Sequence, residues 1–154
     1  MVPKQLDVPL RRQEQPDSCA LACLRMVGAF YGDEWSEDLL RSRVTKGKFG
    51  VTAPNVAALA RGLGYQSEVV SATVVELAVL VAARRPAIVY LRTGNLPGLP
   101  ADRYHAVVVT HVTAQAVALN DPDSGSRQTL PLVEFLRAWT ATECTAIVAF
   151  PRRS

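Results

Sequence analysis

QEQPDSCALACL, the sequence of residues 13–24, decides the fold of this chain. It follows a polar, proline-containing stretch that we interpret as an extended N-terminal arm at residues 1–12. Its second half opens a helix, expected over 19–31, for which Asp17 or Ser18 is the capping residue. Apolar residues lie on most sides of that helix, a pattern typical of a helix buried in a core. The sequence therefore predicts a buried helix with a cysteine at its N-terminus.

The rest of the pattern predicts helices first and then a mainly antiparallel sheet. We expect further helices at 36–44, 52–63, 74–83 and 132–139, and strands at 65–70, 87–91, 105–112, 116–119 and 145–150. A loop rich in glycine and proline is expected at 94–103, and a turn at 121–125. This order predicts an α+β fold in a single domain of residues 1–154, with an N-terminal helical subdomain packed on the sheet.

The composition narrows the classes of function. Of 154 residues, 49% are apolar and 20% are charged, so the chain can bury a core. The net charge is only +3, and the arginine pairs are scattered without aromatic residues between them, which argues against nucleic-acid binding. No apolar run approaches the ~20 residues of a membrane span, and the N-terminus has no apolar signal segment. We therefore expect a soluble, cytoplasmic protein.

The cysteines and histidines are too few for a metal site or a disulfide framework. The three cysteines are an odd number, they form no C-x-x-C pair, and only two histidines are present. We expect no metal and no other cofactor. Cys23 lies one helical turn after Cys19 and is expected in the core. Cys144 stands next to a strand without polar neighbours and is expected to be inert.

Cys19 has the sequence position of a cysteine nucleophile. The dipole at a helix N-terminus lowers the pKa of a thiol, and a nearby imidazole then takes its proton. His105 opens an apolar strand, and Asp121 follows the next short strand. A hairpin that joins these strands brings the imidazole to a carboxylate that orients it. Gln13, six residues before Cys19, is the candidate amide donor to a developing oxyanion.

Each of these residues also has an ordinary structural interpretation. Cys19 alone fits a buried structural cysteine, and Asp121 alone fits the turn chemistry of Asp-Pro with a glycine close behind. The alternative amide donor is Gln15, the alternative partner of the imidazole is Asn120, and the alternative base is His111. The order Gln, Cys, His and Asp, taken together, favours the catalytic interpretation.

These residues resemble the bacteriocin-processing, double-glycine leader peptidases, a papain-like group often fused to peptide-exporting ABC transporters. The matching blocks are residues 13–24, His105-Ala106-Val107-Val108-Val109 and Asp121-Pro122, and the resemblance covers roughly residues 8–150. It implies Gln13 as oxyanion donor, Cys19 as nucleophile, His105 as base and Asp121 as the residue that orients the base. It also implies the papain-like fold, with the active site in the cleft between the helical subdomain and the sheet.

The chain departs from the family pattern beside the site. Ala20 stands where the family favours glycine after the nucleophile, Ser18 where aspartate is common, and Ala106 where a bulkier residue follows the histidine. The methyl group of Ala20 is expected to narrow the subsite for the residue before the scissile bond. The loop at 94–103 is expected to rim the cleft. No transporter sequence follows the peptidase-like region before the chain stops at Ser154, so we expect a stand-alone domain.

The expected function is a cysteine peptidase that cleaves a peptide or leader sequence through a thioester acyl-enzyme. By resemblance, the cleavage site is Gly-Gly or Gly-Ala, and the partners are a peptide or protein substrate and a separately encoded export system. A deamidase or transamidase acting on a protein would use the same catalytic residues. A non-catalytic module that docks peptides is the third interpretation, and the joint presence of the four candidate residues counts against it.

Overall fold

The computed structural model describes residues 5–44, 51–96 and 103–152. Within these ranges the chain forms five α-helices, one 3-10 turn and six strands, which confirms the predicted α+β class. The helices are α1 (Cys19–Phe30), α2 (Glu37–Arg43), α3 (Ala53–Gly62), α4 (Val74–Ala82) and α5 (Leu132–Thr140). None of the helices in the described ranges is long and apolar enough to cross a membrane.

The strands form one antiparallel sheet in the order β1-β6-β2-β3-β4-β5. They are β1 (Tyr65–Ser71), β2 (Ala87–Arg92), β3 (Tyr104–Val112), β4 (Ala116–Asp121), β5 (Ser126–Pro131) and β6 (Thr145–Pro151). β5 is the one strand of these that the sequence does not predict. It lies at the sheet edge with most of its side chains exposed, so it has no apolar alternation.

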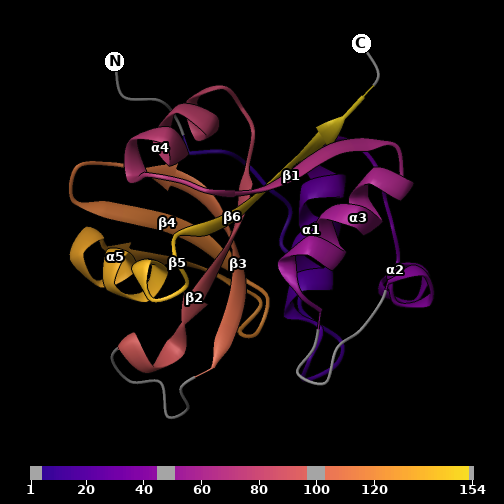
Figure 1. The fold of residues 1–154 in the computed structure, drawn as a ribbon, viewed down its shortest axis with the longest axis horizontal. Coiled ribbons are helices and arrows are strands. Elements are labelled where there is room, and N and C mark those ends of the chain that lie inside the picture. Colours follow the sequence, from indigo (N-terminus) through magenta and orange to yellow (C-terminus); the bar gives the residue numbers. More distant parts are fainter. Residues whose placement is uncertain (1–4, 45–50, 97–102, 153–154) are drawn as a thin grey trace.

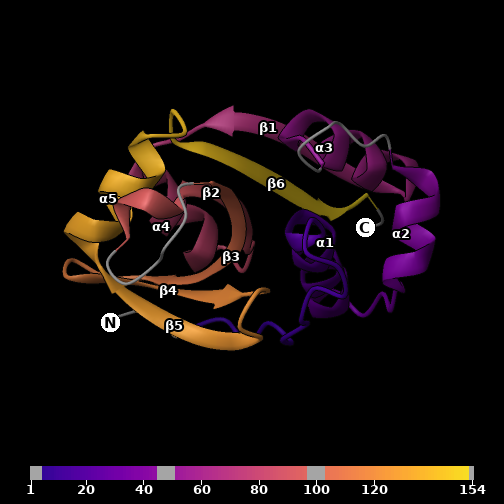
Figure 2. The ribbon, with the colours of Figure 1, turned by 90° about the horizontal axis from the view of Figure 1, so that it is seen from below.

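The molecule has two halves that meet along α1 (Figure 1). The helical half contains α1, α2 and α3, and the sheet half contains β2 to β5 together with α4 and α5. The strands β1 and β6 extend from the sheet half over the helical half, where they pack against α3 (Figure 2). Between the halves, α1 packs on β3. The predicted helical subdomain on an antiparallel sheet is confirmed.

The helix α1 is buried along most of its length, as its apolar sequence predicts. Its N-cap residue is Ser18, but this side chain makes no capping hydrogen bond, so the expected capping role is wrong for Ser18. Instead, Ser18 Oγ accepts from the backbone N–H of Gln15 and donates to the Gln15 carbonyl, both at 3.0 Å. The hydroxyl thus closes the turn before the helix. The N-cap residues of the next two helices, Ser36 and Thr52, do accept backbone hydrogen bonds.

Residues 5–17 cross the molecule without forming a helix or a strand. Leu6 and Val8 are buried, and the backbone N–H of Leu6 donates to the carbonyl of Thr110 in β3 at 2.9 Å. In β4, Asn120 Nδ2 donates to the carbonyl of Val8 at 3.0 Å. The arm is therefore packed on the sheet half before the chain enters the helical half. Residues 1–4 of the predicted arm lie outside the described ranges.

A β-bulge interrupts the pairing of β3 with β4 between Val109 and His111. With regular pairing, His105 and His111 would share a face of the strand, but an extra residue breaks the alternation. Thr110 is buried in the bulge, and its Oγ1 donates to the carbonyl of Ala118 at 3.3 Å. His105 precedes the bulge and is buried at the start of β3, whereas His111 is half-buried beyond it.

Candidate active site

Cys19 is the first residue of α1 and lies against the start of β3. Its thiol is hydrogen-bonded to the imidazole of His105 and to the backbone of Ala106 and Ala20. Burial on its own raises the pKa of a thiol, but these hydrogen bonds and the charge of His105 outweigh it. The pKa of Cys19 therefore lies below its ordinary value, and the thiolate is favoured.

His105 is the second residue of β3 and is only 5% exposed. Its Nε2 lies 2.7 Å from Asp121 Oδ1, which leaves Nδ1 as the ring nitrogen for the thiol. Burial lowers the pKa of an imidazole, but the hydrogen bonds to Asp121 and Cys19 outweigh this and raise the pKa of His105 to about 9. The two shifts together favour a thiolate next to an imidazolium, which is the activated form of a cysteine nucleophile.

The carboxylate of Asp121 is held by the turn that follows β4. Its Oδ1 accepts from the backbone N–H of Asp123 at 2.9 Å, and its Oδ2 accepts from Ser124 Oγ and Gln128 Nε2, both at 3.1 Å. Burial raises the pKa of this carboxyl, but His105, Asp123 and Ser124 outweigh it and lower the pKa below its ordinary value. The Asp-Pro turn signals the first two of these donors in the sequence. Gln128 belongs to the unpredicted β5 and has no such signal.

Asn120, the alternative partner of the imidazole, points away from it. Its Nδ2 donates to the carbonyl of Val8 at 3.0 Å and lies 3.7 Å from Met26 Sδ, and the side chain is fully buried. Adjacent side chains of a strand face opposite sides of the sheet, so Asn120 and Asp121 separate. The structure brings Asp121, and not Asn120, to His105.

Gln13 lies where the two halves meet. Its backbone N–H donates to the carbonyl of Pro122, in the turn after β4, at 2.8 Å. Its side-chain Nε2 donates to the carbonyls of Gln15 at 3.0 Å and Pro16 at 3.1 Å, while Oε1 is buried with no partner among the described residues. The amide group therefore sits in the turn that leads into Cys19, with its hydrogens directed at carbonyl oxygens. The side chain of Gln15, the alternative donor, belongs to an exposed residue.

The remaining cysteines and the second histidine do not share this environment. Cys23 is fully buried, and burial raises the pKa of its thiol well above the ordinary value. Burial also raises the pKa of Cys144, which precedes β6. His111 lies near the end of β3, where it pairs with Ala118 of β4, and its buried Nδ1 has no hydrogen-bond partner within the described ranges. Over those ranges, no three His, Cys, Asp or Glu side chains gather in a way that could hold a metal ion.

The end of the sheet at which β3 begins, beside His105, carries exposed polar and aromatic groups. Tyr104, the first residue of β3, is 60% exposed. Arg103 pairs with Asp123 at 3.7 Å and so links the segment before β3 to the turn after β4. The loop expected to rim the cleft, residues 94–103, begins within the 3-10 turn Thr93–Asn95. Its residues 97–102 lie outside the described part of the chain.

Comparison with known proteins agrees with this geometry. Residues 7–151 match the model of the Peptidase C39 family. A search of curated proteins gives no match. The crystal structure of the peptidase domain of Streptococcus ComA, a bi-functional ABC transporter involved in a quorum-sensing pathway, is 25% identical with a TM-score of 0.76. The alignment covers 94% of this chain and 99% of that chain.

A second solved structure has the same fold. It is a double glycine motif protease from the AMS/PCAT transporter in complex with the leader peptide, 22% identical with a TM-score of 0.76, and it aligns over 96% of this chain and 94% of its own. The family model spans nearly the whole chain, and both structures extend over the helical and the sheet half alike. This chain therefore belongs to the peptidase C39 family and is a cysteine peptidase with the papain-like fold.

Proposed function

We propose that this chain cleaves a peptide leader, after Gly-Gly or Gly-Ala, by way of a thioester between Cys19 and the leader. The observation that carries the proposal is the hydrogen-bonded line from Cys19 through His105 to Asp121. It supplies a thiolate, a proton donor and an orienting carboxylate at one place. In this assignment Cys19 is the nucleophile, His105 is the general acid and base, and Asp121 holds the imidazole.

The proposed reaction uses Cys19 and His105 at each proton transfer and each bond change. The sulfur of Cys19 attacks the scissile carbonyl carbon, and the π electrons of the carbonyl move to its oxygen. Collapse of the tetrahedral intermediate breaks the C–N bond, and the His105 imidazolium gives its proton to the leaving amine. Neutral His105 then takes a proton from water, whose oxygen attacks the thioester carbon. Release of the peptide acid restores the thiolate and the imidazolium.

The oxyanion needs hydrogen-bond donors near the sulfur. The N–H groups in the first turn of a helix have no acceptor within the helix, so we assign the backbone N–H of Cys19 as one donor. The second is Gln13 Nε2. In the free protein this amide donates to the carbonyls of Gln15 and Pro16, and we propose that one of these acceptors is exchanged for the oxyanion when substrate binds.

The proposal for the substrate is supported by the similarity to a solved protease and by one residue of this chain. The similar AMS/PCAT protease is described as a double glycine motif protease in complex with a leader peptide. Here Ala20 is buried directly after Cys19, and we expect its methyl group to restrict the neighbouring subsite to glycine or alanine. We further propose an export system as the partner that takes the product. The three free cysteines favour a reducing compartment such as the cytoplasm.

A peptide library tests the proposal. Peptides that differ at the residue before the scissile bond are incubated with the protein and with Cys19→Ala, and the products are identified by mass spectrometry. We expect two fragments after glycine or alanine, and none with the variant. Cleavage only after Phe, Leu or Arg would contradict the substrate assignment. Deamidated or amine-transfer products without fragments would favour the deamidase or transamidase, and an unreactive Cys19 would favour a docking module.

A further inference from the structure

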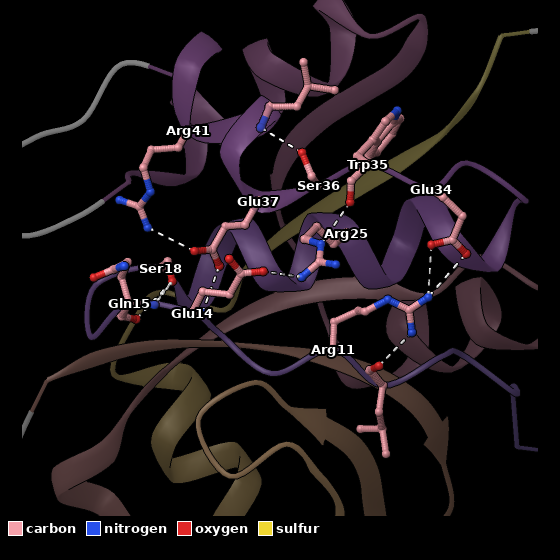
Figure 3. A network of polar contacts seen from close by, with 12 residues as sticks. Arg11, Glu14, Gln15, Ser18, Arg25, Glu34, Trp35, Ser36, Glu37 and Arg41 are labelled. Atoms are coloured by element: carbon pink, nitrogen blue, oxygen red, sulfur yellow. Dashed lines mark hydrogen bonds and ion pairs between the residues drawn. The ribbon is translucent and has the colours of Figure 1, made fainter.

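A buried carboxylate outside the proposed catalytic residues anchors the segment that carries Gln13. Glu37, in the first turn of α2, is 1% exposed. Its Oε1 accepts a hydrogen bond from the backbone N–H of Glu14, and its Oε2 accepts one from Arg41 Nη2, both at 3.1 Å (Figure 3). A buried charge is costly unless it is paired, and both oxygens of Glu37 have a partner. The carboxylate therefore fixes the backbone at Glu14 relative to α2.

Two consecutive backbone N–H groups bind opposite halves of the molecule at this point. The N–H of Gln13 donates to the carbonyl of Pro122 in the sheet half at 2.8 Å. The N–H of Glu14 donates to Glu37 in the helical half. The backbone that carries the Gln13 amide is therefore held from both sides, and removal of either contact frees it to shift.

A second set of contacts holds Glu14 through its side chain. The carboxylate of Glu14 accepts from Arg25 Nη1 of α1 at 3.3 Å, and Arg25 Nε donates to the carbonyl of Trp35 at 2.9 Å (Figure 3). The Glu14 carboxylate is half exposed, and ion pairs of this kind contribute little. The charge-assisted hydrogen bond to the buried Glu37 is the stronger anchor of the two.

We infer that Glu37 is a positioning residue for peptide cleavage, because it holds the Glu14 backbone so that the Gln13 amide stays in the turn that leads into Cys19. The inference rests on the proposed role of Gln13 as a donor to the oxyanion. A preorganised donor stabilises the oxyanion only at hydrogen-bond distance, so a small displacement weakens it strongly. Glu37 therefore acts on the step that forms the oxyanion, and not on the thiolate–imidazolium pair.

Variants at Glu37 separate these two steps. Glu37→Ala removes the acceptor for the Glu14 N–H, and we expect kcat for a double-glycine peptide to fall about ten- to hundredfold with little change in KM. That loss is smaller than the roughly 10²–10³-fold expected for removal of the donor itself in Gln13→Ala. Alkylation of Cys19 by iodoacetamide forms no oxyanion, so its rate should stay within about twofold of the wild type. Glu37→Gln keeps an acceptor oxygen and should restore most of kcat.

The controls distinguish positioning from a general loss of stability. Asp38→Ala removes an exposed carboxylate from the same helical turn and should leave both rates unchanged. If Glu37→Ala does not fold, Glu37→Asp keeps the charge, shortens the side chain by one methylene group and should lower kcat alone. The double variant Gln13→Ala/Glu37→Ala should be no slower than Gln13→Ala, because Glu37 acts through Gln13.

Three results would overturn the inference. The first is a rate of Cys19 alkylation that falls together with kcat in Glu37→Ala. The second is a double variant whose kcat lies below that of Gln13→Ala by the same factor that Glu37→Ala alone causes. The third is an unchanged kcat in Gln13→Ala. Failure of the inference remains distinct from failure of the proposed function. Loss of peptide cleavage in Cys19→Ala supports the peptidase assignment whatever the Glu37 variants do.

Discussion

At the scale of single residues, three side chains decide where the protons of the site reside. The hydrogen bond between Cys19 and His105 lowers the pKa of the thiol and raises that of the imidazole, so the pair titrates as a unit. Asp121 adds a second hydrogen bond that raises the pKa of His105 further. The thiolate–imidazolium pair therefore exists between the deprotonation of the thiol and that of the imidazole near pH 9.

The three cysteines are expected to differ in their reaction with iodoacetamide. Cys19 should react at least about tenfold faster than Cys23 or Cys144, because its pKa is lowered, whereas burial raises the pKa of the other two. Brief labelling of the folded protein near neutral pH, followed by peptide mapping, measures the three rates. His105→Ala should remove most of the advantage of Cys19. Equal labelling of all three cysteines would contradict the assignment of the nucleophile.

The pH dependence of cleavage is expected to be bell-shaped. kcat/KM should rise with pH as Cys19 loses its proton, and fall near pH 9 as the His105 imidazolium loses the proton that the leaving amine needs. Asp121→Asn removes a negative partner that raises the pKa of His105, so the alkaline limb should move to lower pH. A profile between about pH 5 and pH 10 tests this. An alkaline limb at the same pH in the variant would contradict it.

The sequence allows the proximity of Cys19, His105 and Asp121 to be predicted. Cys19 stands at a helix N-terminus, and a hairpin brings His105 next to Asp121. The sequence does not allow the contacts that hold them to be predicted in full. Gln128 reaches Asp121 only because β5 pairs with β4. An acidic residue such as Glu37 is common in the first turn of a helix, where its negative charge interacts favourably with the helix dipole. The burial of Glu37 depends on tertiary packing and cannot be read from the sequence.

At the scale of elements, the sequence predicts those whose apolar residues repeat with the period of a helix or a strand. The strand that begins next to His105 and the helix that begins at Cys19 are of this kind, and both lie in the core. β5 has no such period, because it is an exposed edge strand that pairs through its backbone. The bulge in β3 likewise depends on the register with β4, which the sequence of one strand does not contain.

The glycines of two helices provide a matched test of packing. A Cβ atom at Gly28 of α1 would lie 2.6 Å from Trp35 Cζ3, and the Trp35 ring also packs on Tyr65 at 5.0 Å between centroids. Gly28→Ala is therefore expected to destabilise the protein by about 1–3 kcal/mol, although alanine is the better helix former. At Gly62, the last residue of α3, nothing lies within 4 Å of such an atom. Gly62→Ala should leave the protein as stable or raise its stability by up to about 1 kcal/mol.

Urea unfolding of the two glycine variants measures both free energies. The comparison is informative because both substitutions add one methyl group to a helix and differ mainly in what that group meets. A loss of stability of the same size in both variants would show that the Trp35 contact is not the cause. Unchanged stability in Gly28→Ala would show that the indole ring moves aside without cost.

At the scale of the whole molecule, the candidate site exists only while the two halves are docked. Cys19 belongs to the helical half, and His105 and Asp121 belong to the sheet half. One hydrophobic core contains residues of both halves, including those of α1 and β3. The segment 5–17, which contains the described part of the arm, adds contacts to each half, through Leu6 on β3 and through Glu14 on α2. We therefore expect the halves and the arm to unfold as one cooperative unit.

Truncation of a buried side chain of the arm tests this cooperativity. Leu6 is 4% exposed, and Leu6→Ala should cost about 2–5 kcal/mol, because it removes apolar contacts and leaves a cavity. Val75, on α4, is 70% exposed, so Val75→Ala should change the stability by no more than about 0.5 kcal/mol. Urea unfolding gives the free energy of each variant.

The rate of Cys23 alkylation then shows whether the loss of stability in Leu6→Ala also increases the opening of α1. Cys23 is fully buried, so it reacts with an alkylating agent only when α1 becomes exposed, and its labelling rate follows the population of the open state. Since each 1.4 kcal/mol is a factor of ten, Leu6→Ala should raise that rate by about 30-fold or more, while Val75→Ala should leave it unchanged. A Leu6→Ala variant that unfolds earlier in urea with an unchanged rate at Cys23 would mean that the arm detaches alone. The thiolate of Cys19 would then persist without the arm, because its partners His105 and Ala106 belong to β3.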